Sequence, residues 1–553
     1  MRCLFFLICF LIGFADVSRG LEITEDIDYT LEPVLSSEWV CYIKNGNLYL
    51  RTTGELPIRI NGPGDDAGEV FSPDLEVKGN SIFISWFEKR LGVNKLFFAV
   101  SPGRSKPVFK TVELSGSTQA ATAKIIPLNS GRVCVLEIYP GKPPELNLYV
   151  CPGNDLEFKR TSLEPPDMEY IYSPSLNMTN DALYMFFYGI KGENKIFGAA
   201  AYDMQTMKLR RPLFLKDTKG ISFIQSCNIK QSPFAIYKTV CEGRFVLEGI
   251  YPGAKGWENF SIRDAEGLDV ARMDCRAWDD GKILTVFSGE DKEKFKQRIY
   301  TAAGENESWN MPVSRIDNKE FDNTRSWLPR MASEGDRVIV VWEDSRNIRS
   351  GIMMKLSTDR GKTWLKNDVL ISDAKHYAFR PRISFAEGAF HVAWHQFRDD
   401  EKKKADLALM KISWDDAVKM ESLKTESMDI IRKEALLRER VGSYWKGMIE
   451  KDLKTTYALH DPFYRARIPF DYYSILRGPM VYHSYSIESY RIEGNIASVN
   501  VKVKYEVPKL TILGKDNAIP TKEVMTEDTY LFIDGNWSRK FVDALSGGSA
   551  VDY

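Results

Sequence analysis

The chain has 553 residues, of which 44% are hydrophobic and 12% aromatic, and its 75 basic residues nearly balance 76 acidic ones. This composition excludes wholesale disorder and predicts sizeable buried cores. The formal net charge of −1 gives no general attraction to nucleic acid or anionic membranes, so we expect no nucleic-acid partner, and any anion site must come from a local cluster of cations.

The N-terminus has the organisation of a secretory signal peptide. Arg2 forms a short basic start, residues 3–15 are an apolar run, and the small residues Ser18 and Gly20 suit cleavage before Leu21. We therefore predict export, with the mature chain secreted or periplasmic. No later stretch is apolar over enough residues to span a bilayer, so we expect no transmembrane segment after cleavage.

Export makes disulfides permissible. Cys134 and Cys151 flank the turn PGKPPE (140–145) symmetrically, which predicts that they face each other across a hairpin and form a bridge. Cys227 and Cys241 flank QSPF in a similar way, so we predict a second bridge there. None of the cysteine spacings matches a zinc pattern, and we predict no metal site.

A repeat of about fifty residues is the most informative signal in the sequence. In the four best copies a proline is followed thirteen residues later by an aromatic residue. These copies are SPDLEVKGNSIFISW (72–86), SPSLNMTNDALYMFF (173–187), LPRMASEGDRVIVVW (328–342) and RPRISFAEGAFHVAW (380–394). Weaker copies lie before the first of these, at residues 38–52, and between the others, at residues 131–151, 232–251 and 271–287.

Each of these eight units offers short β-rich runs separated by turn residues, enough for four strands. Units of this length with four strands each are typical of a β-propeller. We therefore predict a mainly β protein whose residues 21–422 form an eight-bladed propeller of four-stranded blades. A seven-bladed ring is the alternative, if the first unit only completes the last blade.

The stretch STDRGKTW, at residues 357–364, follows the predicted third strand of unit seven. It resembles the Asp-box (BNR) repeats of sialidases and related propellers at all five fixed positions: Ser357, Asp359, Gly361, Thr363 and Trp364. The pattern favours a structural role, because Asp359 can accept turn amides, Gly361 can take a positive φ and Trp364 can pack between strands.

The resemblance to sialidases also implies an activity to be weighed. Sialidases hold the carboxylate of the substrate with three arginines, use a Tyr/Glu pair as nucleophile and an Asp as acid/base, and carry an R-I-P motif near the N-terminus. This chain has one complete Asp box, and its R-I-P lies at 467–469, outside the predicted propeller. We therefore assign no catalytic residue, and a sialidase-like glycoside hydrolase is the alternative to a binding function.

Three successive units carry arginine at one position of their first strand: Arg272 in ARMD, Arg330 in PRMA and Arg382 in PRIS. The first strand of a propeller blade lies nearest the axis, so these side chains are expected to converge there. Three guanidiniums would suit a carboxylate, sulfate or phosphate through bidentate hydrogen bonds. The alternative is that each arginine forms an inter-blade salt bridge or lies solvated at the rim.

Other polar residues follow the repeat. Arg90, Arg346 and Arg398 each lie four residues after the tryptophan of their unit. The nearby acids Asp344, Glu343 and Asp74 could serve acid/base roles if a pocket forms. We interpret this second arginine column as loop residues inherited by duplication. His391 and His395 share the parity of one strand, and one or both are interpreted as interior polar residues.

After about residue 422 the β repeat stops, and residues 423–553 are predicted to form a second domain. Residues 425–452 have the apolar pattern of a helix with one buried stripe, shorter helical segments follow, and strands continue to a hairpin at Asp534-Gly535. The stretch YWKGMIEKDLKTTYALHDPFYRARI (444–468) resembles the NTF2-like (SnoaL-like) family. The resemblance implies an α+β cone fold. Domains of this family include isomerases and dehydratases, and many serve only as ligand or dimer modules.

These patterns together predict an exported binding protein. Its propeller would hold an anionic or glycan ligand near the central axis, with an acidic saccharide or another anionic small molecule as partner and no cofactor. The C-terminal domain would assist docking to a protein partner. A sialidase-like exo-glycoside hydrolase and a non-catalytic envelope scaffold are the two alternatives.

Overall fold

The computed structural model describes residues 21–541 apart from short internal segments, so the predicted signal peptide lies outside the described residues. The internal segments left out are 30, 63–67, 120–121, 129–132, 152–155, 180, 219–222, 230–231, 254–255, 263–264, 266–267, 292–295, 306–311, 319–323, 400–401, 403, 423–429, 478 and 513–514.

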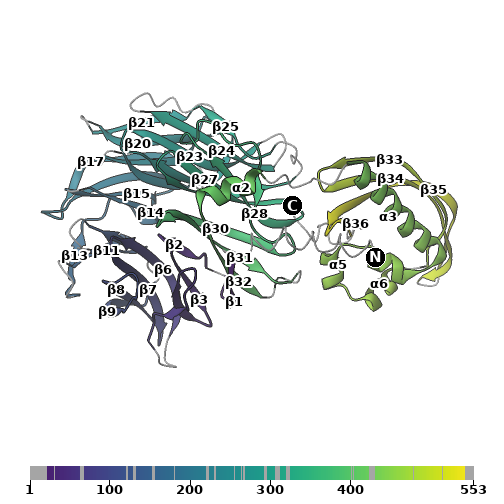
Figure 1. The fold of residues 1–553 in the computed structure, drawn as a ribbon, viewed down its shortest axis with the longest axis horizontal. Helices are drawn as coiled ribbons and strands as arrows, with labels where there is room; N and C mark the ends of the chain where they lie inside the picture. Colours follow the sequence, from purple (N-terminus) through teal and green to yellow (C-terminus); the bar gives the residue numbers. More distant parts are fainter. Residues whose placement is uncertain are drawn as a thin grey trace, which may run out of the picture.

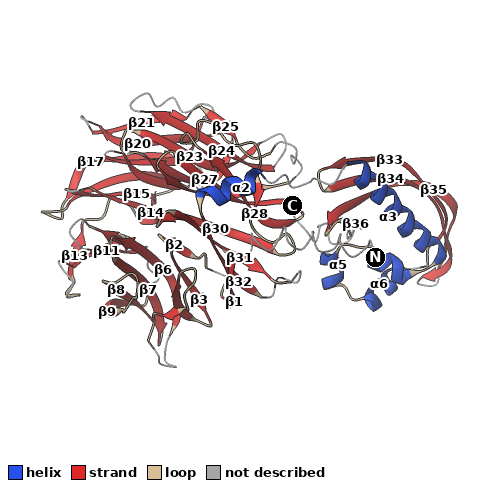
Figure 2. Ribbon diagram, in the orientation of Figure 1, coloured by secondary structure: helices blue, strands red, loops and turns tan. Residues whose placement is uncertain are grey.

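Eight four-stranded antiparallel sheets form the larger part of the molecule (Figures 1 and 2). The first four are β2 (Val34–Ser36), β3 (Trp39–Lys44), β4 (Asn47–Arg51) and β5 (Ile58–Arg59); β6 (Glu69–Lys78), β7 (Ser81–Arg90), β8 (Val93–Ser101) and β9 (Lys110–Ser117); β10 (Thr122–Pro127), β11 (Val133–Tyr139), β12 (Glu145–Cys151) and β13 (Lys159–Leu163); and β14 (Tyr170–Met178), β15 (Ala182–Lys191), β16 (Asn194–Asp203) and β17 (Leu209–Thr218).

The second four sheets complete this part of the chain. They are β18 (Ile224–Ile229), β19 (Ser232–Cys241), β20 (Arg244–Gly253) and β21 (Gly256–Ile262); β22 (Asp269–Ala277), β23 (Lys282–Asp291), β24 (Lys296–Glu305) and β25 (Val313–Arg315); β26 (Ser326–Glu334), β27 (Arg337–Asn347), β28 (Arg349–Ser357) and β29 (Val369–Leu370); and β30 (Tyr377–Ala386), β31 (Ala389–Phe397), β32 (Ala405–Ile412) and β1 (Leu21–Ile27).

The first strands of the sheets close a ring. β2 contacts β6, and the contacts continue in order through β10, β14, β18, β22, β26 and β30, which contacts β2 again. The N-terminal strand β1 pairs with β32 and completes the eighth sheet. The predicted eight-bladed propeller is therefore confirmed. The seven-bladed alternative is wrong, because the first unit forms a sheet of its own and the separate strand β1, which precedes that unit, completes the last blade.

A β-bulge marks the proline of the repeat. The register with the second strand shifts across this position in β6, β14, β26 and β30. Proline has no N–H to give to a ladder, which explains why it lies at a bulge. Arg330 and Arg382 are the first residues to pair after the bulge, and Arg272 follows a register shift in β22 that has no proline. A bulge changes the direction in which the neighbouring side chains point, and here these side chains are the three predicted arginines.

Each pair of neighbouring sheets shares its own apolar cluster in the described part of the chain. Trp86 packs between the first and second sheets, Trp342 between the sixth and seventh, and Trp394 between the seventh and eighth. Clusters of the same kind fill the other interfaces. The aromatic residue of the repeat is therefore the residue that packs one blade against the next, which is why it recurs with the repeat.

The structure contradicts the predicted bridge between Cys134 and Cys151. The turn between β11 and β12 spans residues 140–144, so Cys134 pairs with Val150 and Cys151 pairs with Val133. Side chains alternate along a strand, so the two cysteines point to opposite faces of the sheet. Cys134 packs in the cluster shared with the fourth sheet, and Cys151 in the cluster shared with the second.

The predicted bridge between Cys227 and Cys241 is also wrong. Cys227 pairs with Phe234, whereas Cys241 pairs with Arg244 at the far end of β19, about 23 Å farther along the strand at its usual rise. That separation is far beyond the reach of a disulfide. Cys227 instead interacts with Cys275 on the next sheet, and the hydrogen bond between them raises the pKa of Cys275.

A ninth sheet lies outside the ring and belongs to the C-terminal unit, which Figure 1 shows beside the propeller. It consists of β33 (Val481–Glu493), β34 (Ile496–Ile512), β35 (Lys515–Ile533) and β36 (Asn536–Arg539). The described helices are α2 (Trp414–Ser422), α3 (Ile430–Glu450), α4 (Leu453–Ala458), α5 (Pro462–Arg467) and α6 (Phe470–Leu476).

Helix α2 packs on the propeller and ends where the predicted domain boundary falls, whereas α3 packs on the ninth sheet. The dipeptide Asp461-Pro462 lies just after the end of α4. Asp461 also starts α5: its side chain accepts the N–H of Tyr464 at 2.8 Å, and Pro462 occupies the first helical turn. Assignment of the unit to the NTF2-like family remains a prediction.

Polar and aromatic contacts join the two parts of the molecule. Arg349 Nη1 lies 3.0 Å from Asp534 Oδ1, and the ring of Tyr377 packs against that of Phe463 with 5.7 Å between centroids. The C-terminal unit is therefore fixed against the seventh and eighth sheets. Within the described part of the chain, no helix has the length and apolar character needed to cross a membrane.

Candidate functional site

The three predicted arginines lie on the first strands of three successive sheets: Arg272 on β22, Arg330 on β26 and Arg382 on β30. These strands contact one another in this order around the ring. The charges of all three arginines, together with that of Arg380, act on one carboxylate, that of Glu32. The structure therefore brings the predicted arginines together. We call Arg272, Arg330, Arg380 and Arg382 the axial arginine cluster.

Sequence analysis missed two residues of this site, Arg380 and Glu32. Glu32 lies between β1 and β2, where the chain passes from the eighth sheet to the first. Arg382 forms an ion pair with its carboxylate and donates from Nε to the carbonyl of Pro33 at 3.3 Å. Burial favours a raised pKa for Glu32, but the surrounding guanidiniums bring that pKa below its usual value. The cluster therefore holds one internal anion, the ionised carboxylate of Glu32.

Arg272 and Arg330 differ from Arg382, because neither forms an ion pair with any residue that the structure describes. Arg330 Nη1 donates to the carbonyl of Met273 at 3.4 Å, and the guanidinium of Arg272 lies 4.6 Å from the ring centroid of Phe223. Arg272 is exposed and Arg330 is half-buried. Both guanidiniums therefore retain N–H donors that an anion can use.

The positive charges of the cluster repel one another. Burial, followed by the charge of Arg330, lowers the pKa of Arg382 to about 10. Although part of Arg272 is exposed, partial desolvation of its guanidinium, followed by the charges of Arg330 and Arg380, lowers its pKa as well. His395, on β31, has a pKa lowered to about 3 by burial and by the charges of Arg380 and Arg382, so its imidazole is neutral at physiological pH. A bound anion would relieve this repulsion and stabilise the charged guanidiniums.

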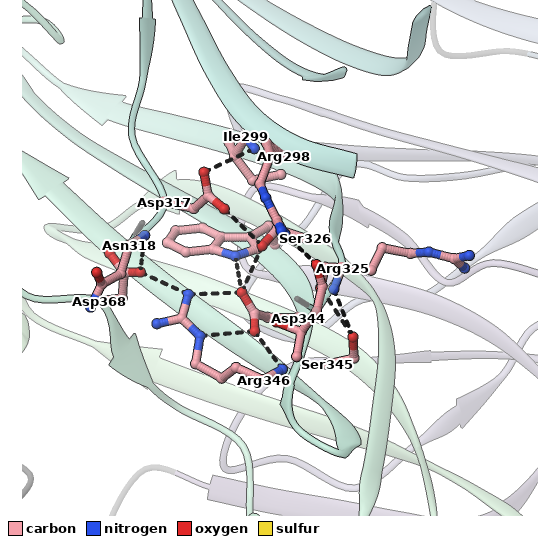
Figure 3. A network of polar contacts seen from close by, with 12 residues as sticks. Arg298, Ile299, Asp317, Asn318, Arg325, Ser326, Asp344, Ser345, Arg346 and Asp368 are labelled. Atoms are coloured by element: carbon pink, nitrogen blue, oxygen red, sulfur yellow. Dashed lines mark hydrogen bonds and ion pairs between the residues drawn. The ribbon is translucent and has the colours of Figure 1, made fainter. Parts of the chain in front are cut away.

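A second group of charges is enclosed within the seventh sheet (Figure 3). Asp344 accepts hydrogen bonds from Nε and Nη2 of Arg346, both at 2.8 Å, and from the indole N–H of Trp342 at 3.0 Å. Arg346 Nη2 also lies 2.8 Å from Asp368, whose other oxygen lies 2.7 Å from Lys355 Nζ. Asp344 is 2% exposed and Arg346 is 6% exposed. This enclosure makes Asp344 a structural residue and leaves it no open face for acid/base chemistry.

The same arrangement recurs in the blade that also has an acidic residue two positions after the repeat tryptophan. In the second sheet, Glu88 accepts the indole N–H of the repeat tryptophan at 2.8 Å and Nε of Arg90 at 2.7 Å. The eighth sheet has Gln396 at this position, and there Arg398 pairs instead with Asp406 at 3.1 Å. The second arginine column therefore consists of paired structural residues. In the sequence, the spacing W-x-[D/E]-x-R indicates this pairing of an acid with an arginine.

The turn after β28 is held by the side chain of Asp359. Its carboxylate accepts the backbone N–H of Thr363 at 2.8 Å, the Thr363 hydroxyl at 2.6 Å and the Ser357 hydroxyl at 2.8 Å. Gly361 has a φ of 81°, and its N–H donates to Ser357 Oγ at 2.8 Å. Trp364 packs between the sixth and seventh sheets. Asp359 therefore acts as a turn residue in this structure, and membership of the Asp-box family remains a prediction.

Neither family models nor curated proteins match the chain. Among solved structures, polysaccharide lyase Uly1 is similar with a TM-score of 0.40 and 8% identity, covering 71% of this chain and 99% of its own. Dihydro-heme d1 dehydrogenase NirN has a TM-score of 0.40 and 10% identity, over 64% of this chain and 74% of that one. The β-propeller domain of the Trilobed protease from Pyrococcus furiosus has a TM-score of 0.36 and 10% identity, over 60% and 91%. Similarity at these values assigns no activity to this chain.

Proposed function

We propose that this protein binds an anionic ligand at the axial arginine cluster, and that the ligand is an acidic saccharide such as a uronic acid. One observation carries the proposal: Arg272 and Arg330 have no ion-pair partner in the described chain, while Arg382 beside them holds the carboxylate of Glu32. Guanidiniums bind carboxylates through paired hydrogen bonds, so a second carboxylate suits the two arginines that lack one.

A sialidase-like hydrolase is the alternative function. Acid/base catalysis of this kind needs a carboxylic acid that holds a proton close to the arginines. Glu32 is ionised, and Asp274 accepts the backbone N–H groups of Cys275 at 2.9 Å and Met331 at 3.0 Å. Asp344 lies in the enclosed network of the seventh sheet. Glu343 does hold a proton, because burial raises its pKa to about 7, but it is 6% exposed and accepts from the Ser350 hydroxyl at 2.9 Å and from the backbone N–H of Arg380 at 3.2 Å. Because these acids are ionised, hydrogen-bonded or buried, a binding function is better supported than hydrolysis.

Calorimetric titration of the purified protein with glucuronate, galacturonate and N-acetylneuraminate tests the proposal. We expect saturable binding that weakens as salt is added, because the attraction is electrostatic. Arg272→Ala and Arg330→Ala should each lower the affinity about tenfold, the effect of losing a charge-assisted hydrogen bond. The matched control is Arg491→Ala, which removes a 77% exposed arginine of the C-terminal unit and should leave the affinity unchanged.

Two results would overturn this ranking of functions. Glucuronate binding that is as tight in Arg272→Ala and Arg330→Ala as in the wild type would remove the arginine cluster from the site. Turnover of a fluorogenic sialoside that disappears in Arg330→Ala would establish the hydrolase.

A protein partner for the C-terminal unit belongs to the same proposal. Exposed apolar side chains gather in sequence from α6 to the start of β33: Tyr472, Ile475, Leu476 and Met480. Such residues are typical of protein interaction surfaces. Ile475→Glu should abolish co-purification of a partner with the protein, and unchanged co-purification would count against this role.

A further inference from the structure

A cavity of about 370 Å³ lies where the first, second and eighth sheets meet, and we call it the junction cavity. Its wall includes Glu38, Trp39, Arg104, Glu387, His391 and Lys411. Glu38 follows β2 whereas Glu32 precedes it, which places the cavity on the order of 20 Å from the axial arginine cluster at the rise of an extended strand. The volume is within the range of small-molecule binding sites.

Two polar side chains in the wall are buried without a hydrogen-bond partner among the described residues. Trp39 is 2% exposed and His391 is 4% exposed, and the indole N–H of Trp39 and both ring nitrogens of His391 lack a partner. The backbone carbonyl of Ala386 lies near the imidazole of His391 but does not meet hydrogen-bond geometry. A carbonyl oxygen only accepts hydrogen bonds, so it could satisfy the N–H of the neutral imidazole but not the other ring nitrogen. Buried polar groups are normally satisfied, so these donor and acceptor atoms point to a ligand with hydroxyl groups.

The charges of the cavity nearly balance. Arg104 binds both oxygens of Glu38 and lies 3.4 Å from Glu387 Oε1, so one cation holds two of the acids in place. Lys411 is directly opposite His391 in the pairing of β31 with β32. Burial, followed by the charge of Lys411, lowers the pKa of His391, so the imidazole is neutral and has one donor and one acceptor. Unlike the arginine cluster, this wall has no excess of positive charge to favour an anion.

We infer that the junction cavity is a second ligand site, which binds a neutral, hydroxyl-rich molecule such as one or two sugar rings. Hydroxyl groups donate and accept together, as the neutral imidazole of His391 requires. The indole N–H of Trp39 supplies a further donor, and the paired Arg104 and Glu38 supply fixed polar groups at the wall. The site is independent of the axial arginine cluster and of the proposed acidic ligand.

Nuclear magnetic resonance of the histidine rings tests this inference directly, because the chain has only five histidines. The purified protein, labelled at histidine, is titrated with methyl glucoside, methyl galactoside, methyl mannoside and maltose. The ring signals of His391, assigned by their displacement in Lys411→Ala, should move saturably with at least one of these sugars. The signals of His483, which is exposed on the C-terminal unit, should not move.

Variants at the rim separate binding from a general effect on the fold. Lys411 and Glu387 are exposed, so Lys411→Ala and Glu387→Ala should fold and should bind the sugar about tenfold more weakly. Arg330→Ala should leave the response of His391 unchanged. The inference is overturned if none of the four sugars moves the His391 signals, if both rim variants bind as the wild type does, or if Arg330→Ala abolishes the response.

Discussion

Arg382 and Glu32 join the two ends of the propeller ring through one ion pair. Arg382 lies on β30 of the eighth sheet, and Glu32 lies in the segment that leads to β2 of the first. The charges of Arg330 and Arg272 also act on this carboxylate and lower its pKa. The ion pair therefore fixes the closing seam of the ring and gives the arginine cluster an internal anion.

Removal of the Glu32 charge should strengthen the binding of an acidic ligand. In Glu32→Gln the arginines no longer share their donors with an internal carboxylate, so we expect glucuronate affinity to rise about tenfold, the equivalent of one charge-assisted hydrogen bond. Calorimetry of the variant and the wild type measures the change. Weaker binding in Glu32→Gln would mean that Glu32 orders the arginines for the ligand, contrary to this account.

The enclosed network of the seventh sheet should be a major source of stability. Arg346→Met leaves Asp344 charged and buried, and loss of one partner of a buried pair costs about 3–5 kcal/mol of unfolding free energy. The matched control is Arg337→Met, which breaks an exposed pair with Glu334 and should cost less than about 1 kcal/mol. Urea denaturation of both variants gives the comparison, and equal midpoints would contradict the structural role of the network.

The turn after β28 should matter for stability and not for binding. Asp359→Ala removes three accepted hydrogen bonds, for which we expect a loss of roughly 1–3 kcal/mol with ligand affinity unchanged. Gly361→Ala should be more destabilising than Gly335→Ala. Both positions have a positive φ, but a Cβ at Gly361 would lie 2.7 Å from Leu284 whereas one at Gly335 meets nothing within 4 Å. A change in affinity on Asp359→Ala would reopen a functional role for this acid.

Glu343 should make the protein less stable as the pH rises toward neutrality. Burial raises its pKa to about 7, so the folded state holds this proton more tightly than the unfolded chain does. The stabilisation is complete below the unfolded pKa of about 4.3 and is lost as the pH rises through about 7, a change of roughly 4 kcal/mol. Glu343→Gln should flatten the pH dependence of the unfolding free energy in this window. Parallel profiles for variant and wild type would contradict the assignment.

The repeat made the propeller predictable from sequence, because the proline and the aromatic residue have the same structural roles in each of the best copies. Proline occupies the bulge of a first strand, and Trp86, Trp342 and Trp394 pack between blades. The same regularity placed Arg272 and Arg330 on first strands. A repeated position therefore predicted both the fold and the convergence of the arginines.

Features that depend on register or on a non-repeated segment could not be predicted in this way. A turn one residue shorter than assumed reverses the face of Cys151 relative to Cys134, and with it the disulfide. Glu32 lies in a linker with no counterpart in the repeat, so nothing in the sequence placed its carboxylate among the arginines. The pairing of His391 with Lys411 also follows from strand register.

A crystal structure of the protein with glucuronate tests the central claim most directly. The account predicts a carboxylate within hydrogen-bond distance of the guanidiniums of both Arg272 and Arg330. Glucuronate bound away from these arginines, or arginines that turn outward from the ring axis, would contradict it.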